Sequence, residues 1–162
     1  MYRLSLILLL LAPIDQRPRR LDSWGVELPR CDMPCVDTAC LPLGRLEDVD
    51  RLLERADHVF YGRVLRAAVS PTCESYATIT LRVLKRWKGA VSDEITVVSG
   101  DPCGRPAPFA AGHDYLVAAF NVFGNPGSPP QVRSCAFPPL TGAEAYEHML
   151  VFNERLRTSG QK

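Results

Sequence analysis

Hydrophobic and polar positions alternate through the middle of the chain. From Ala77 to Val83 every second residue is apolar, a period of two that is typical of a β-strand with one buried face. Residues 113–122 are almost wholly apolar after Asp114, which predicts a strand covered on both faces. The pattern predicts strands over residues 58–65, 76–87, 94–99, 113–122 and 131–134. Gly62 marks an expected bulge, or a point of close backbone approach, in the first of them.

Helical spacing occurs on both sides of these strands. Residues 46–56 place Leu46, Val49, Leu52 and Ala56 on one face, with charged residues opposite. After a proline pair, a second helix is expected over residues 142–156. Its apolar face is predicted from Tyr146, Met149, Leu150 and Phe152.

These elements predict a mostly β domain. The chain has 162 residues, a length that fits one domain, and its 14 prolines and 11 glycines favour many turns. Strands separated by turns, with a short helix before them and a helix after them, indicate a small, partly open barrel of five strands. We assign residues 1–30 to a leader and linker, 31–157 to the domain and 158–162 to a disordered tail.

The N-terminus resembles a signal peptide. Arg3 precedes a stretch, Leu4–Ala12, that is apolar except for Ser5 and too short to span a bilayer. We therefore expect a secreted or periplasmic protein with no stable membrane span. No small-x-small cleavage site precedes the polar residues 15–20, so the sequence does not define where the mature chain begins.

Six cysteines support export. An even count spread along an exported chain predicts a disulfide framework, although six cysteines allow 15 pairings. They are Cys31, Cys35, Cys40, Cys73, Cys103 and Cys135. A zinc site is the alternative, but the spacing of the first three lacks the two-residue knuckle usual in structural zinc sites, so we expect no metal.

Charge and motifs argue against several classes of function. A formal net charge of +1 gives no electrostatic footprint for nucleic acid. The sequence has no nucleophile elbow, phosphate-binding loop or dinucleotide fingerprint, so we expect neither an enzyme nor a cofactor. His58 is expected at a strand start, His113 in a turn and His148 on the exposed side of the last helix. A lone histidine in such a place is usually an exposed residue with no catalytic role.

Residues 82–88 combine basic side chains with Trp87. We expect Arg82, Lys85, Arg86 and Lys88 to form a solvated face rather than a binding patch. We expect Trp87 to cap one end of the barrel.

Five short motifs in a fixed order carry a family resemblance. They are Leu52–Asp57 running into Val59–Val64, Val83–Gly89, Cys103–Gly104, Ala111–Val117, and Ser134–Cys135 before Leu140. In this order they resemble bacterial proteins similar to the tissue inhibitors of metalloproteinases, which have a netrin-like OB-type barrel. The resemblance covers roughly residues 38–155.

The resemblance implies a partner and a mechanism. In the animal inhibitors a Cys-x-Cys begins the mature chain, and the α-amine and carbonyl of its first cysteine bind the protease zinc. Cys40 matches the second cysteine, whereas the first position is Thr38. The implied contact segment is Thr38, Ala39 and Cys40, the implied partner is a zinc metalloprotease, and the protein is expected to be a monomer.

The resemblance also implies disulfide pairings. It pairs Cys40 with Cys135. Cys103 then pairs with Cys31 or Cys35, preferably Cys31, and Cys73 pairs with whichever of these two cysteines remains. Two functions follow as hypotheses. One is a secreted metalloendopeptidase inhibitor, and the alternative is a netrin-like binding or structural module without inhibitory activity, because Thr38 replaces the first cysteine.

Overall fold

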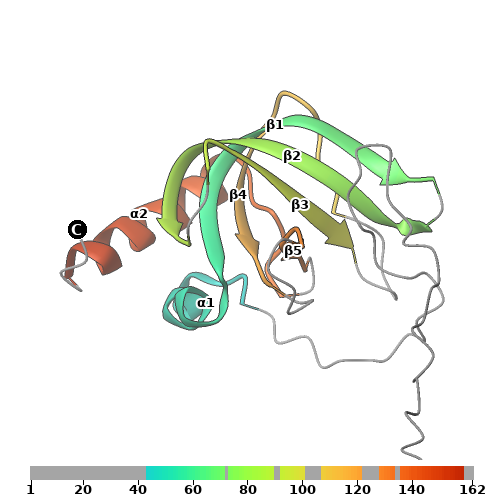
Figure 1. The fold of residues 1–162 in the computed structure, drawn as a ribbon. Helices are drawn as coiled ribbons and strands as arrows, with labels where there is room; N and C mark the ends of the chain where they lie inside the picture. The colour runs from blue at the N-terminus through green and yellow to red at the C-terminus, as the bar shows by residue number, and fades with distance from the viewer. Residues whose placement is uncertain are drawn as a thin grey trace, which may run out of the picture.

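The computed structural model describes residues 43–71, 73–89, 92–100, 107–121, 128–133 and 136–158. A 3₁₀ turn, η1 (Leu46–Asp48), leads directly into a short helix, α1 (Val49–Arg55). Five strands follow, and a final helix, α2 (Gly142–Thr158), lies against the outside of the sheet (Figure 1). The strands are β1 (His58–Ser70), β2 (Cys73–Lys88), β3 (Glu94–Gly100), β4 (Asp114–Ala119) and β5 (Gln131–Val132).

The sheet curls into a half-barrel of OB-like type. Its strand order is β4-β1-β2-β3-β5, with β3 and β5 parallel and the other pairs antiparallel. Beyond the end of β4, Phe120 and Gln131 exchange two backbone hydrogen bonds of 2.9 and 2.8 Å, which brings the two edges of the sheet together. The mostly β class, the five strands and the two flanking helices predicted from sequence are therefore confirmed.

Two apolar layers follow from the alternation along the strands. One face of β2 and β3 lines the barrel interior through Ile79, Leu81 and Val97, which pack with Phe60 and Val117. The second layer lies outside β1 and β4, where both helices cover it. It contains Leu43, Val49, Leu52, Ala56, Val59, Trp87, Leu116, Ala118, Phe137, Leu140, Ala145 and Phe152.

Gly62 is at a register shift between β1 and β2, so the predicted bulge is confirmed. A Cβ at this position would approach the carbonyl oxygen of Arg82 to 2.9 Å, closer than real Cβ atoms come. The predicted two-sided burial of the fourth strand is also confirmed, because β4 is buried from Tyr115 to Ala119.

The first two strands extend further than predicted. β1 continues to Ser70, and β2 begins at Cys73, so the two form a long hairpin beyond the barrel. Ala67 and Ala68 carry little β-propensity of their own and are held in the ladder by pairing with Ile79 and Thr78.

The buried face of α2 differs from the prediction. Tyr146 is 61% exposed and Leu150 is 51% exposed, whereas Ala145, His148 and Phe152 are buried. The prediction was therefore wrong for Tyr146, for Leu150 and for the exposure of His148. It was right for Phe152, which is buried, and for Met149, which packs partly buried against the same cluster. The helix is rotated so that Phe152 meets Trp87, with ring centroids 5.5 Å apart, and Trp87 Nε1 donates to Asn153 Oδ1 at 3.0 Å.

We predict that Gly100→Ala destabilises the fold much more than Gly112→Ala. Both glycines have positive φ, 122° and 81°, so each alanine carries backbone strain of about 1–2 kcal/mol. At position 100 the new Cβ would also fall 1.9 Å from the carbonyl oxygen of Ser75, whereas nothing lies within 4 Å at position 112. Urea denaturation would measure both, and equal losses of unfolding free energy would contradict the prediction.

Candidate functional site

The segment singled out by the family resemblance ends two residues before the first described residue, Leu43. Its backbone nitrogen donates to the carbonyl oxygen of Ala136 at 2.6 Å. Its side chain is buried in the layer beneath the helices, together with Phe137 and Leu140. Hydrophobic burial and a backbone hydrogen bond therefore fix the chain where it enters the barrel.

His148 of α2 holds the next residue. Its Nδ1 lies 2.9 Å from the carbonyl oxygen of Glu144, one helical turn earlier, and its Nε2 lies 3.1 Å from the carbonyl oxygen of Gly44. The ring packs edge-on against Phe137. At Gly44 a Cβ would come within 3.3 Å of Pro138 Cδ, so this part of the chain passes close to the loop before α2.

Leu43, Gly44, Ala136, Pro138 and His148 together form what we call the entry clamp. It joins the start of the described chain to α2 and to the loop that precedes α2. The sequence pattern did not reveal the entry clamp, because a histidine among the charged residues of a helix predicts an exposed side chain. The signal that could have revealed it is the spacing of Ala145, His148 and Phe152 on one helical face.

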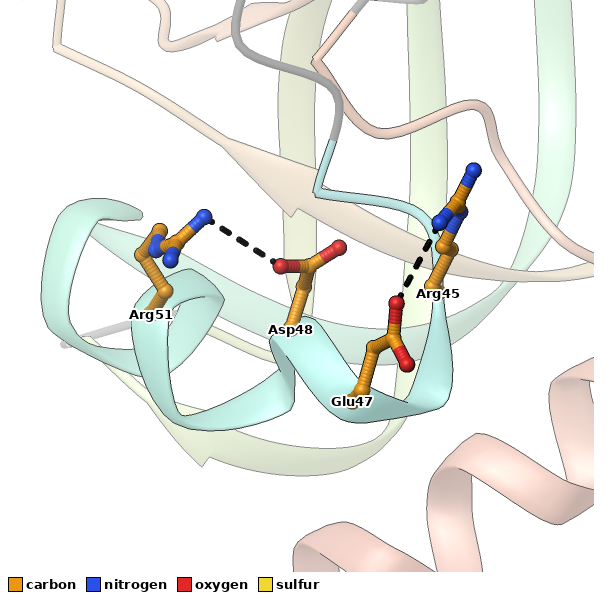
Figure 2. A network of polar contacts seen from close by, with 4 residues as sticks. All are labelled: Arg45, Glu47, Asp48 and Arg51. Atoms are coloured by element: carbon orange, nitrogen blue, oxygen red, sulfur yellow. Dashed lines mark hydrogen bonds and ion pairs between the residues drawn. The ribbon is translucent and has the colours of Figure 1, made fainter.

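Paired charges surround the chain just after the entry clamp. Figure 2 shows Arg45 beside Glu47 and Arg51 beside Asp48, each pair with an N–O distance of 3.3 Å. These side chains lie at the surface, where ion pairs contribute about 0–1 kcal/mol each. The opposite charges balance, so the surface around η1 and the start of α1 has no strongly positive or strongly negative electrostatic potential.

The basic residues of β2 also have partners. Arg82 lies 3.8 Å from Glu94, and Lys85 Nζ lies 5.2 Å from the ring centre of Trp87. Lys88 Nζ donates to the carbonyl oxygens of Leu53 and Glu54 at 2.6 and 2.9 Å, and so caps the C-terminus of α1. These contacts distribute the basic side chains among several structural roles, and Trp87 lies beneath α2.

Arg63 and Asp114 form the best-aligned ion pair among the described residues. Arg63 Nε and Nη2 donate to the two carboxylate oxygens of Asp114 at 2.7 and 2.9 Å and so join β1 to β4. This hydrogen bonding, together with the attraction between the charges, lowers the pKa of Asp114 and raises the pKa of Arg63.

The other predicted residues are placed as follows. Thr38, Ala39, Cys40, Cys31, Cys35, Cys103 and Cys135 lie outside the described residues. Cys73 is buried at the start of β2, and the disulfide framework and its pairings remain predictions. His58 begins β1 and His113 follows the turn at Gly112, as expected.

The described residues contain neither a cluster of metal ligands nor a membrane-spanning helix. Within residues 43–158, excluding the stretches that the structure leaves undescribed, no three His, Cys, Asp or Glu side chains are grouped so that they could hold a metal ion. No helix in these ranges is long and apolar enough to cross a membrane.

Comparison with known proteins gives no family assignment. No family model matches the chain, and no curated protein matches it. The resemblance to metalloproteinase inhibitors therefore rests on the five ordered motifs alone.

We predict that His148→Leu lowers the unfolding free energy by about 1–3 kcal/mol, because it removes a buried ring whose nitrogens face two carbonyl oxygens and leaves the half-buried carbonyl oxygen of Gly44 without this partner. His113→Leu is the matched control: His113 is exposed, so the change should stay within about 0.5 kcal/mol. Denaturant titration of both variants at pH 7 would measure the difference. If the unfolding free energy of the His148→Leu variant equals that of the parent protein, the entry clamp contributes nothing to stability.

We predict that Asp114→Asn reduces stability at neutral pH and that the difference from the parent protein narrows in acid. The folded state lowers the pKa of Asp114, so its stabilising effect is present above the unfolded-state pKa of about 4. That effect is lost as the pH falls through the folded-state pKa. The measurement is unfolding free energy against pH, and a constant difference between pH 7 and pH 2 would contradict the assignment.

Proposed function

We propose that this protein is an exported binding domain that blocks a zinc endopeptidase through the segment Thr38–Cys40. The observation that carries the proposal is the entry clamp. A binding segment loses little conformational entropy when the residues beside it are already fixed. Here Leu43 and Gly44 are held by Ala136 and His148, and only two residues separate them from the proposed contact segment.

The entry clamp is also compatible with the family's central disulfide. Cys40 precedes Leu43 by three residues, and Cys135 precedes Ala136 by one. Three residues span at most about 10 Å, so the Leu43–Ala136 hydrogen bond keeps the attachment points of both cysteines close together. A Cys40–Cys135 disulfide would add a covalent bond to a contact that the backbone already makes.

A binding module without inhibitory activity is the second candidate. Thr38 in place of the family's first cysteine favours it, as does the lack of a signal-peptidase site directly before Thr38. Without that cleavage no α-amine at Thr38 is available as a zinc ligand. Inhibition would then depend on the contact segment filling the active-site cleft.

The test is inhibition of a panel of zinc endopeptidases by the purified mature protein, with its N-terminus mapped by mass spectrometry. We expect inhibition at about micromolar protein, which corresponds to roughly −8 kcal/mol of binding free energy. Ala39→Glu should abolish it by placing a charge in the contact segment. Ala143→Glu, on the exposed first turn of α2, is the matched control and should inhibit like the parent.

Failure to inhibit any member of the panel would favour the binding module. Equal inhibition by the Ala39→Glu variant and the parent would show that another surface makes the contact. A mature N-terminus near residue 15 would exclude zinc binding by an α-amine while leaving inhibition by the segment open.

A further inference from the structure

Two exposed leucines flank a pair of directly opposed arginines in the β1–β2 ladder. Arg63 of β1 is the Cα partner of Arg82 of β2. Leu65 and Leu84 have no Cα partner in this ladder, because each is the extra residue at a register shift. A bulge bends its strand and redirects its side chains, so the features that curl the sheet also place these leucines.

These side chains lie on the outside of the sheet, where β1 and β2 run side by side (Figure 1). Val64 and Val83 pack with the interior cluster, so the residues on either side of each valine point outward. Lys85 lies on the same side, because its Nζ is 5.2 Å from the ring centre of Trp87 in the layer beneath the helices. We call this set the outer β1–β2 face; it consists of Arg63, Leu65, Arg82, Leu84 and Lys85.

All members of the outer β1–β2 face are exposed. Leu65 is 37% exposed and Leu84 is 49% exposed, and Lys85 and both arginines are exposed as well. Among the described residues, neither leucine belongs to an apolar cluster. Single exposed leucines are common, but two of them among three cations are typical of a surface that meets lipid headgroups.

The cations of this face are only partly neutralised. Like charges directly opposite each other destabilise a ladder, and each arginine has a carboxylate on its other side. Asp114 binds Arg63 through two hydrogen bonds, whereas Glu94 lies 3.8 Å from Arg82 and both of these side chains are more than half exposed. Among the described residues no carboxylate is paired with Lys85, whose contact is with an aromatic ring. Arg82 and Lys85 therefore keep donors for a further anion.

We propose that the outer β1–β2 face binds the surface of a membrane that contains anionic phospholipid. Arg82 and Lys85 donate to lipid phosphates, while Leu65 and Leu84 enter the boundary between the headgroups and the acyl chains. A soluble polyanion or an acidic protein would satisfy the cations and leave the leucines in water. The two leucines therefore favour a membrane, which offers phosphates and an apolar layer together.

Membrane binding goes beyond the proposed function and does not depend on it. It uses side chains of β1 and β2, so a protein that inhibits no protease would bind vesicles equally well. The attachment is peripheral, since it involves exposed side chains of the sheet and requires no helix that enters the bilayer.

The test is co-sedimentation of the full-length protein with phosphatidylcholine vesicles and with vesicles that contain an equal part of phosphatidylglycerol. We expect binding to the anionic vesicles alone, weakened by added salt. Arg82→Gln and Lys85→Gln should each lower the binding constant about 5-fold, the size expected for the loss of one cation near an anionic surface. Arg55→Gln, which removes an exposed cation from α1, is the matched control and should bind like the parent.

Leu84→Ser distinguishes a membrane from other anionic partners. We expect it to lower vesicle binding about 5-fold, because the exposed half of the leucine side chain leaves water on binding. Leu150→Ser is the matched control, since Leu150 is 51% exposed on α2. Leu65→Ser replaces Leu84→Ser if circular dichroism shows that the latter does not fold.

Three results would overturn the proposal. The first is no binding of the parent protein to anionic vesicles. The second is an equal loss in Arg55→Gln and Arg82→Gln, which would mean that net charge alone attracts the protein. The third is weakened binding of Arg82→Gln with unchanged binding of Leu84→Ser, which would assign the face to a soluble polyanion or an acidic protein.

Discussion

The bend of β1 at Gly62 is the constraint on which the rest of the fold depends. β1 pairs with β4 from His58 to Arg63 and with β2 along nearly its whole length. One strand can serve both neighbours in a curled sheet only if it bends, and bulges supply that bend. At Gly62 the carbonyl oxygen of Arg82 occupies the space that a side chain would need, so the bend and the glycine require each other.

Curling creates an outer surface that also has to be covered. On the β1–β4 side α2 provides the cover, with Phe152 against Trp87 and the histidine of the entry clamp beside them. This arrangement connects the helix, the barrel and the start of the domain in one packed layer. A change in the angle of α2 would therefore move Gly44 and Leu43 as well.

Local patterns predicted those features that depend on neighbouring residues in sequence. The alternation from Ala77 to Val83 identified the interior face of β2, and Gly62 identified the bulge. The rotation of α2 could not be predicted in the same way, because Tyr146 and Leu150 are as apolar as the residues that were buried. Which face of α2 is buried is determined by contacts between residues distant in sequence, above all the contact of Phe152 with Trp87. The burial of His148 could not be predicted for the same reason. A polar side chain is buried where it finds hydrogen-bond partners, and the carbonyl oxygen of Gly44 is distant from it in sequence.

The cysteine pattern predicted a disulfide framework but not its pairings, because six cysteines allow many different pairings.

The entry clamp changes how the Thr38 substitution should be weighed. If zinc binding by an α-amine were the only source of affinity, the loss of the first cysteine would end inhibition. Leu43 is fixed by a buried side chain and a 2.6 Å hydrogen bond, and a contact segment that precedes such a fixed residue would lose less conformational entropy on binding than one at a free chain end. Burying even a few such residues against a protease contributes binding free energy in proportion to the apolar area removed from water. Rigidity of the scaffold, rather than the chemistry of its first residue, is then the property on which inhibition by this chain would depend.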